Sequence, residues 1–144
     1  MTECIDLLAQ TMLFAGIAPV EIAELLGCLH ARRVSYAKGD MVIEEGSCVR
    51  EFGVLLSGRA RSIKWDANDK LIIITLLAAG SEIGVLLAAS PEHESPVSVE
   101  VQEDSSVLLI PYDNLLAQCE KACPQHERLL RNYIGIVASK GLVL

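Results

Sequence analysis

Turn signals recur at short and even intervals through the middle of the chain, from residue 33 to residue 111. They separate short runs that are apolar or that alternate between apolar and polar residues. Strands spaced in this way are typical of an antiparallel sandwich or roll. The run LIIITLL at 71–77 is apolar on both faces and predicts a strand buried on both sides, and VSVEV (97–101) and SVLLI (106–110) predict the last strand pair. The turn segments are YAKGD (36–40), EEGS (44–47), SGR (57–59), DAND (66–69), AAGS (78–81), SPEHESP (90–96) and QEDSS (102–106).

Helical periodicity replaces this alternation at both ends of the chain. Residues 2–14 predict one helix with Met12 on its apolar face, and a second helix begins at Pro19 and ends near His30. Pro124 begins the last helix. A length of 144 residues is enough for one domain with its own core. The predicted organisation is mainly β with flanking helices: N-terminal helices in 1–30, a β-roll in 31–111 and C-terminal helices in 112–144.

The last predicted helix carries a wide apolar stripe. A helix this apolar needs a cover, so we expect the stripe to pair with a second copy of the chain. Gly135 and Ser139 lie four residues apart and would let a second helix approach closely. The alternative is that Gly135 is only tolerated there, at a cost of about 1 kcal/mol relative to alanine. The expected dimer face is Leu129, Tyr133, Ile136 and Val137.

Charge and hydropathy exclude several classes of protein. The formal net charge is −7, and the only basic cluster is Arg59, Arg61 and Lys64, so the chain offers no nucleic-acid-binding surface. No apolar run reaches the roughly 18 residues that a membrane span needs. The N-terminus lacks the basic region of a signal peptide, which predicts a cytoplasmic location without a membrane partner.

Cysteine and histidine give no strong metal signal. Five cysteines without a CxxC pair indicate neither a disulfide framework nor a zinc ribbon. Cys119, Cys123 and His126 fall at i, i+4 and i+7 and are weak metal candidates, but Pro124 interrupts the helix between them. We therefore predict no metal site, with both cysteines buried and His126 in solvent. His93 is also expected to face water.

Catalytic motifs are missing from the sequence. It contains no GxSxG, no HExxH and no P-loop. The acidic residues fall mostly in predicted turns and at helix starts, where they cap or are solvated. The sequence therefore predicts that the protein is not an enzyme.

Segments YAKGDMVIEEGS, FGVLLSGRARS and GSEIGV resemble the N-terminal sensor domain of the Crp/Fnr family of bacterial transcription regulators. From Tyr36 to Leu115 the family pattern fits without a gap. The resemblance implies a double-stranded β-helix, or jelly roll, of the cyclic-nucleotide-binding type, followed by a long dimerisation helix. The glycines that carry it, in order, are Gly39, Gly46, Gly58, Gly80 and Gly84.

The resemblance also locates a ligand site and argues against its usual ligand. Nucleotide-binding members have a glutamate for the ribose after the second glycine of the GSEIGV bend. Ten residues later an arginine binds the phosphate, and Ser or Thr follows. Here these positions hold Val85, Ser95 and Pro96. Burying a phosphate without a cation costs several kcal/mol, so we do not expect a cyclic nucleotide. The expected lining is Ser62, Thr75, Leu77, Gly84, Val85, Leu86, Ser95, Pro96 and Val97.

Another cation could replace the missing arginine. The resemblance implies that Ala60, Ser62 and Lys64 face inward, so Lys64 could meet an anion; alternatively it reaches water from the end of its strand. Without that cation the lining is apolar with a few hydroxyls, which suits a small neutral ligand. A third possibility is a cavity filled by its own side chains.

The resemblance implies an effector-sensing and dimerisation domain of a Crp/Fnr-type regulator, acting as a homodimer. DNA would be bound only through a helix-turn-helix that is absent from these 144 residues. The effector is unknown, with a small molecule favoured over haem or a metal. Two alternatives stay open: a stand-alone β-roll that binds a small molecule, haem or a metal without acting on DNA, and a structural interaction domain with an occluded pocket.

Overall fold

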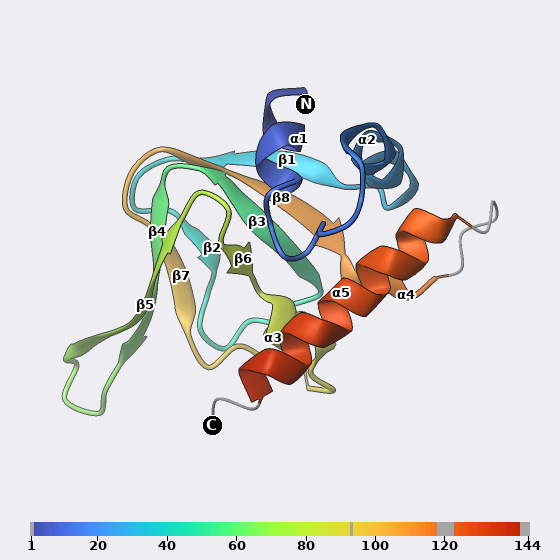
Figure 1. Cartoon of the computed structure of the whole chain (residues 1–144). Helices are drawn as coiled ribbons and strands as arrows, with labels where there is room; N and C mark the ends of the chain where they lie inside the picture. Colours follow the sequence, from blue (N-terminus) through green and yellow to red (C-terminus); the bar gives the residue numbers. More distant parts are fainter. Residues whose placement is uncertain (1, 93, 118–122, 142–144) are drawn as a thin grey trace.

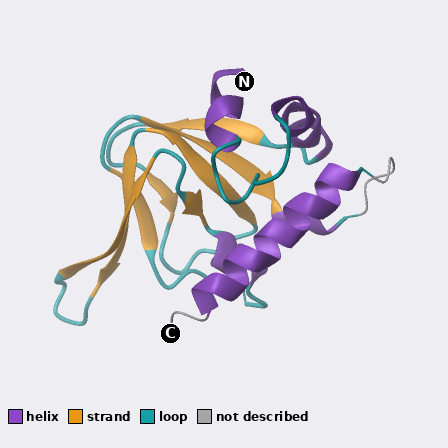
Figure 2. Cartoon of the chain, in the orientation of Figure 1, coloured by secondary structure: helices purple, strands orange, loops and turns teal. Residues whose placement is uncertain are grey.

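The computed structural model describes residues 2–92, 94–117 and 123–141. Within them, helices flank a β-roll as the sequence predicts (Figures 1 and 2). No described helix has both the length and the hydropathy required to cross a membrane. The elements are α1 (Thr2–Leu8), α2 (Pro19–Cys28), β1 (Arg32–Tyr36), β2 (Met41–Ile43), β3 (Glu51–Ser57), β4 (Arg59–Trp65), β5 (Leu71–Ala78), β6 (Glu82–Ile83), α3 (Val85–Ala89), β7 (Ser98–Val101), β8 (Ser105–Pro111), α4 (Tyr112–Leu116) and α5 (Pro124–Gly141).

The strands form two antiparallel sheets, in the orders β1-β8-β3-β6 and β2-β7-β4-β5. Their facing sides enclose one apolar core. β7 and β8 follow each other in sequence but lie in different sheets, so the prediction that they pair is wrong. The exchange of sheets between consecutive strands is what closes the roll, and it confirms the predicted jelly-roll class.

Register places a set of side chains on the interior side of the second sheet. Ser62 of β4 pairs with Thr75 of β5 and with Val99 of β7. Two residues further along β4, Ala60 pairs with Leu77 and with Val101. Since directly paired residues point to the same side of a sheet, these side chains share the inner face.

β5 departs from its prediction. Its run LIIITLL is not buried on both sides: Ile74 is 53% exposed and Leu76 is 70% exposed. The reason is position, because β5 is the edge strand of its sheet and the β4–β5 hairpin projects away from the roll (Figure 1). Most side chains of this apolar strand therefore face solvent, because no other described element covers them.

The first helix is shorter than predicted. α1 ends at Leu8, and the following turns leave Met12 exposed instead of on the apolar face. Thr11 ends the helix locally, since its Oγ1 donates to the Leu8 carbonyl at 2.6 Å and accepts from the Phe14 N–H at 3.4 Å. α2 begins at Pro19 and ends at Cys28, close to the prediction.

α5 packs across the roll and contacts α2, α3 and α4 (Figure 1). Leu129, Tyr133 and Ile136 of the expected dimer face are buried in the core of their own chain. Val137 is partly buried against the same core. The apolar stripe therefore covers the roll, and its inner side is not available to a second copy.

Candidate ligand-binding site

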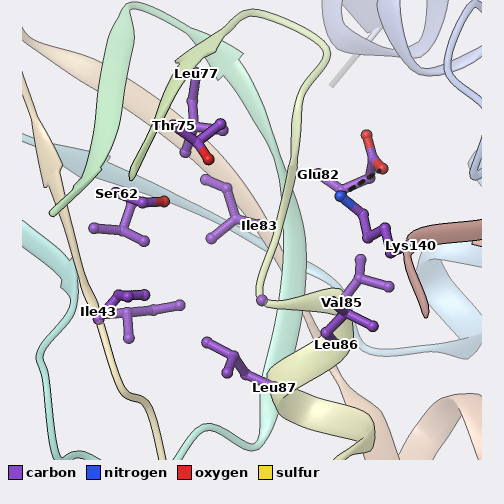
Figure 3. Close-up of a pocket in the computed structure, with 13 residues that line it drawn as sticks. Ile43, Ser62, Thr75, Leu77, Glu82, Ile83, Val85, Leu86, Leu87 and Lys140 are labelled. Atoms are coloured by element: carbon purple, nitrogen blue, oxygen red, sulfur yellow. Dashed lines mark ion pairs between the residues drawn. The ribbon is translucent and has the colours of Figure 1, made fainter. Parts of the chain in front are cut away.

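A cavity of about 150 Å³ lies where the second sheet meets the Gly84 bend and the end of α5 (Figure 3), and it is partly open to solvent, since Thr75 and Leu86 in its wall are exposed. Most of its wall is aliphatic. Ser62 and Thr75 contribute hydroxyls, and within the described part of the chain neither hydroxyl has a hydrogen-bond partner. The lining is Ile43, Ser62, Thr75, Leu77, Glu82, Ile83, Gly84, Val85, Leu86, Leu87, Val97, Val99 and Lys140.

The Gly84 bend forms one wall of this cavity. Gly84 has a φ of +73°, and a Cβ there would lie 3.2 Å from the Glu51 carbonyl oxygen. Both facts require glycine, because other residues reach positive φ only with strain. The bend turns the chain from β6 into the short helix α3, which sets Ile83 and Val85 against the cavity.

Charge at the cavity comes from Glu82 and Lys140. Their side chains lie 4.0 Å apart and are partly exposed, with Lys140 reaching in from the last turn of α5. No arginine is found in the lining among the residues described. Figure 3 shows Glu82 directed toward Lys140, on the other side of the β6 segment from Ser62 and Thr75. The lysine in the described lining therefore lies at the edge of the cavity beside a carboxylate, and not beside the two hydroxyls.

Lys64 does not supply a cation either. It is exposed on the projecting hairpin, so of the two alternatives the one with its ammonium in water is correct. Arg61 on the outer face pairs with Glu100 at 2.9 Å, and Arg59 pairs with Glu103 at 3.4 Å. The basic cluster seen in the sequence is therefore largely neutralised by neighbouring carboxylates.

Most of the predicted ligand residues do line one cavity: Ser62, Thr75, Leu77, Gly84, Val85, Leu86 and Val97. Ser95 and Pro96 are not in its wall. The Ser95 hydroxyl is occupied, since it donates to the Val97 carbonyl at 2.6 Å, and Pro96 is exposed. Sequence reasoning missed Ile43, Glu82, Ile83, Leu87, Val99 and Lys140. Alternation along the strand would have found Val99, but Lys140 lies in a distant helix that no local pattern connects to the cavity.

Tyr133 of α5 contacts the chain directly after the Gly84 bend. Its hydroxyl donates to the carbonyl oxygen of Val85, the first residue of α3, and its side chain is 2% exposed. Burial raises the pKa of this phenol above its ordinary value, so the hydroxyl stays protonated and remains a donor.

The weak metal candidates do not converge in the described chain. Cys119 lies outside the described residues, as does His93. His126 is 8% exposed, so its predicted solvation is wrong; its Nε2 lies 2.7 Å from the Leu115 carbonyl oxygen, and Nδ1 has no partner in residues 2–92, 94–117 and 123–141. The Cys123 thiol donates to Gln125 at 2.6 Å. Nowhere in those ranges do three metal-ligating side chains cluster.

Solved structures share this fold. The catabolite activator protein of Thermus thermophilus superposes with a TM-score of 0.74 at 21% identity, covering 92% of this chain and 58% of that protein. The N-terminal domain of a transcriptional regulator from Streptomyces coelicolor A3(2) gives 0.77 at 18% identity, with 94% of each chain covered. The sensor domain of the transcriptional regulator DNR from Pseudomonas aeruginosa gives 0.69 at 19% identity, over 94% of this chain and 89% of that one.

These neighbours are Crp/Fnr-type transcriptional regulators, as the sequence resemblance implies, and they are regulatory and sensing proteins instead of enzymes. A search of curated protein sequences found no significant match. The family described as the cyclic nucleotide-binding domain matches residues 33–122, which is most of the chain. With its roll, its glycine bend and its cavity in place, the chain belongs to the cyclic nucleotide-binding domain family.

Proposed function

We propose that this chain is the effector-sensing and dimerisation domain of a Crp/Fnr-type transcription regulator. Its family and its fold support the regulatory role that the neighbours' descriptions give them. The chain spans 58% of the Thermus protein, and DNA would be bound by a helix-turn-helix outside residues 1–144. A net charge of −7 supports this division, since the DNA-binding surface must be basic.

The effector in this proposal is a small neutral molecule and not a cyclic nucleotide. One observation carries this choice: the described cavity wall is mostly aliphatic with two unpartnered hydroxyls, it has no arginine, and its lysine, Lys140, lies beside the Glu82 carboxylate. A neutral polar group can satisfy Ser62 and Thr75, whereas a buried phosphate without a cation would lose several kcal/mol of hydration. Val85 and Ser95 stand where the family's glutamate and arginine would bind the nucleotide.

Thermal unfolding tests the effector class. Cyclohexanol is the neutral probe, and cAMP and cGMP are the comparison. A ligand at about a hundred times its Kd stabilises the folded state by about 2.7 kcal/mol. Cyclohexanol should raise the Tm, and Ser62→Phe should abolish that rise by filling the cavity. Stabilisation by cAMP at micromolar concentration would overturn the proposed ligand class.

Dimerisation in this proposal uses the outer side of α5. Ile134 is 58% exposed, and Leu130 and Val137 at its edges are partly buried. Leu130, Ile134 and Val137 are separated by four and then three residues, which is the spacing of apolar residues along the contact line between two paired helices. Gly135 has open space around it, as a close helix contact requires. The proposed pairing face therefore lies beside the buried face formed by Leu129, Tyr133 and Ile136, and is not that face itself.

Sedimentation velocity tests this dimer. The unmodified chain should sediment as a concentration-dependent dimer, and Ile134→Glu should shift it to monomer, because a carboxylate in an apolar seam is desolvated without a partner. Lys64→Glu, on the exposed hairpin, is the control and should leave the dimer intact. A chain that stays monomeric at every concentration would remove dimerisation from the proposal.

A further inference from the structure

A second hollow lies on the first sheet, where β1 ends and β8 begins. This is the end of both strands that lies away from α2 and α4 (Figure 1). The hollow is an open groove of about 610 Å³, a volume within the range of small-molecule sites. Its lining is mostly polar, in contrast to the aliphatic wall of the first cavity. The polar groups used below are Arg33, Ser35, Asp40, Ser57, Asp104 and Ser106.

A β-bulge in β3 shapes this groove. Leu55 pairs with Val107 of β8, but the next pair is Ser57 with Ser106, so two steps along β3 match one step along β8. A bulge of this kind re-aims the side chain beyond it. Ser57 therefore shares the side of the sheet that holds Ser106, and their hydroxyl oxygens lie 2.9 Å apart. Ser35 of β1 pairs with Ser106 from the other side, so three hydroxyls lie in a row across three strands.

Arg33 lies beside this row of hydroxyls. It comes two residues before Ser35, on the same side of β1, and its Nη2 donates to the Ser106 hydroxyl at 3.4 Å. In the described part of the chain no carboxylate forms an ion pair with Arg33, whereas the neighbouring Arg32 pairs with Glu51 at 2.7 Å. A guanidinium offers five donors in a planar fork, which is the geometry that binds a carboxylate. This part of the groove is therefore suited to a carboxylate group.

Two carboxylates lie further along the same groove. Asp40 Oδ2 accepts from the Ala37 N–H at 2.8 Å. Asp104 Oδ1 accepts from the Lys38 N–H at 3.0 Å. Among the described residues, the second oxygen of each aspartate accepts no hydrogen bond and meets no cation. Asp104 lies two residues before Ser106, which is about 7 Å of extended chain and more than a direct ion pair spans. The groove thus holds one positive group and two negative groups that do not neutralise one another.

We propose that this groove binds a free amino acid with a cationic side chain. The carboxylate of the ligand lies on Arg33 and the serine hydroxyls, and its ammonium groups face the second oxygens of Asp104 and Asp40. Each of these contacts is a charge-assisted hydrogen bond, which is stronger than one between neutral groups. A simple anion is disfavoured, because two aspartates would repel it. The groove shares no lining residue with the cavity beside the Gly84 bend, so this site is independent of the effector proposed there.

Two-dimensional amide NMR tests this site with L-lysine as the probe. L-lysine at millimolar concentration should shift the amide signals of residues 33–40 and 104–106. Cadaverine has the same two amines without the carboxylate, and inorganic phosphate is an anion without an amine. Each should bind at least about tenfold more weakly, as loss of a charge-assisted hydrogen bond implies. Equal binding of either compound, or no shift with L-lysine, would overturn the proposal.

Two variants test the two ends of the ligand. Arg33→Leu should weaken L-lysine binding about tenfold, and so should Asp104→Asn, which keeps an oxygen for the Lys38 N–H. Arg59→Leu removes an exposed arginine outside the groove and is the matched control, which should bind L-lysine as the unmodified chain does. Unchanged affinity in either groove variant, or an equal loss in Arg59→Leu, would overturn the proposal. The cyclohexanol response of Arg33→Leu should be unchanged, which separates failure of this site from failure of the proposed function.

Discussion

Strands β5 and β8 have similarly apolar sequences and lie in opposite environments. β8 contains Leu108 and Ile110, which are fully buried, while β5 contains Ile74 and Leu76, which are mostly exposed. β8 pairs with β1 on one side and β3 on the other, whereas β5 is an edge strand on a projecting hairpin (Figure 1). Position in the sheet, and not hydropathy, decides which of the two belongs to the core.

An exposed apolar edge strand is unusual in a stable protein. Native edges are commonly short, charged or covered, because open backbone groups template further pairing. Beside β5, two basic residues of the neighbouring strand β4 pair with it: Arg61 with Leu76 and Lys64 with Ile72. From the contrast with β8 we expect stability to depend on the buried strand, and any pairing through an open sheet edge to depend on β5.

The largest change in the free energy of unfolding should come from truncating a buried isoleucine of β8, and the same truncation of an exposed isoleucine of β5 is its matched control. Ile110→Ala removes a side chain with no exposure and should lower the free energy of unfolding by about 3 kcal/mol. Ile74→Ala makes the same chemical change on β5 and should cost less than about 1 kcal/mol. Urea unfolding at low protein concentration measures both. Equal costs would break the comparison and indicate that β5 is covered.

A second, smaller effect concerns the buried part of the chain: the pH dependence of stability that comes from Tyr133. Burial raises the pKa of Tyr133 above its ordinary value of 10.0, so the folded state holds the neutral phenol more firmly than the unfolded chain does. The resulting stability is complete below about pH 10 and is lost as pH rises through the folded pKa.

Tyr133→Phe is the variant that isolates this phenol. It should cost about 1 kcal/mol near pH 7 and flatten most of the alkaline decline. The pKa of Tyr36 is also raised by burial, so a weaker decline should remain. Chemical unfolding at a series of pH values checks this. An unchanged alkaline decline in Tyr133→Phe would assign the effect to other groups.

The smallest effect on stability belongs to the exposed strand. Leu76→Ser should change the free energy of unfolding by no more than about 0.5 kcal/mol, because Leu76 already faces solvent. It should nevertheless reduce self-association at high concentration by removing exposed apolar surface. Light scattering against concentration measures this, with unfolding as the control. A large loss of stability would show that Leu76 is packed in the folded chain.

Much of the fold was predictable from local signals. Glycine turns, proline-started helices and alternating runs act over a few residues, so α2, α5 and most strands lie where the sequence predicts them. The end of α1 was not predicted. The apolar spacing of residues 2–14 is that of a helix, but the Thr11 hydroxyl donates to the Leu8 carbonyl and ends the helix there. The pairing of β7 and β8 was wrong because adjacency in sequence does not determine the sheet.

The candidate site was predictable in part. Ser62, Thr75 and Val85 follow from the family resemblance together with strand alternation, and they share one cavity. The prediction for Ser95 was wrong because its hydroxyl donates to the nearby Val97 carbonyl and does not enter the cavity. Lys140 could not have been found, since it reaches the cavity only through the packing of a helix whose sequence gives no sign of that contact.

By itself the sequence determined the class of fold, the bend at Gly84 and the lack of an arginine at the family's phosphate position. Only the tertiary structure decided that β5 is exposed, that the inner face of α5 is used within the chain, and that Tyr133 meets Val85, 48 residues away. The reason is range: backbone preferences and turn chemistry are local, whereas the partner of a buried side chain is set by how whole elements pack.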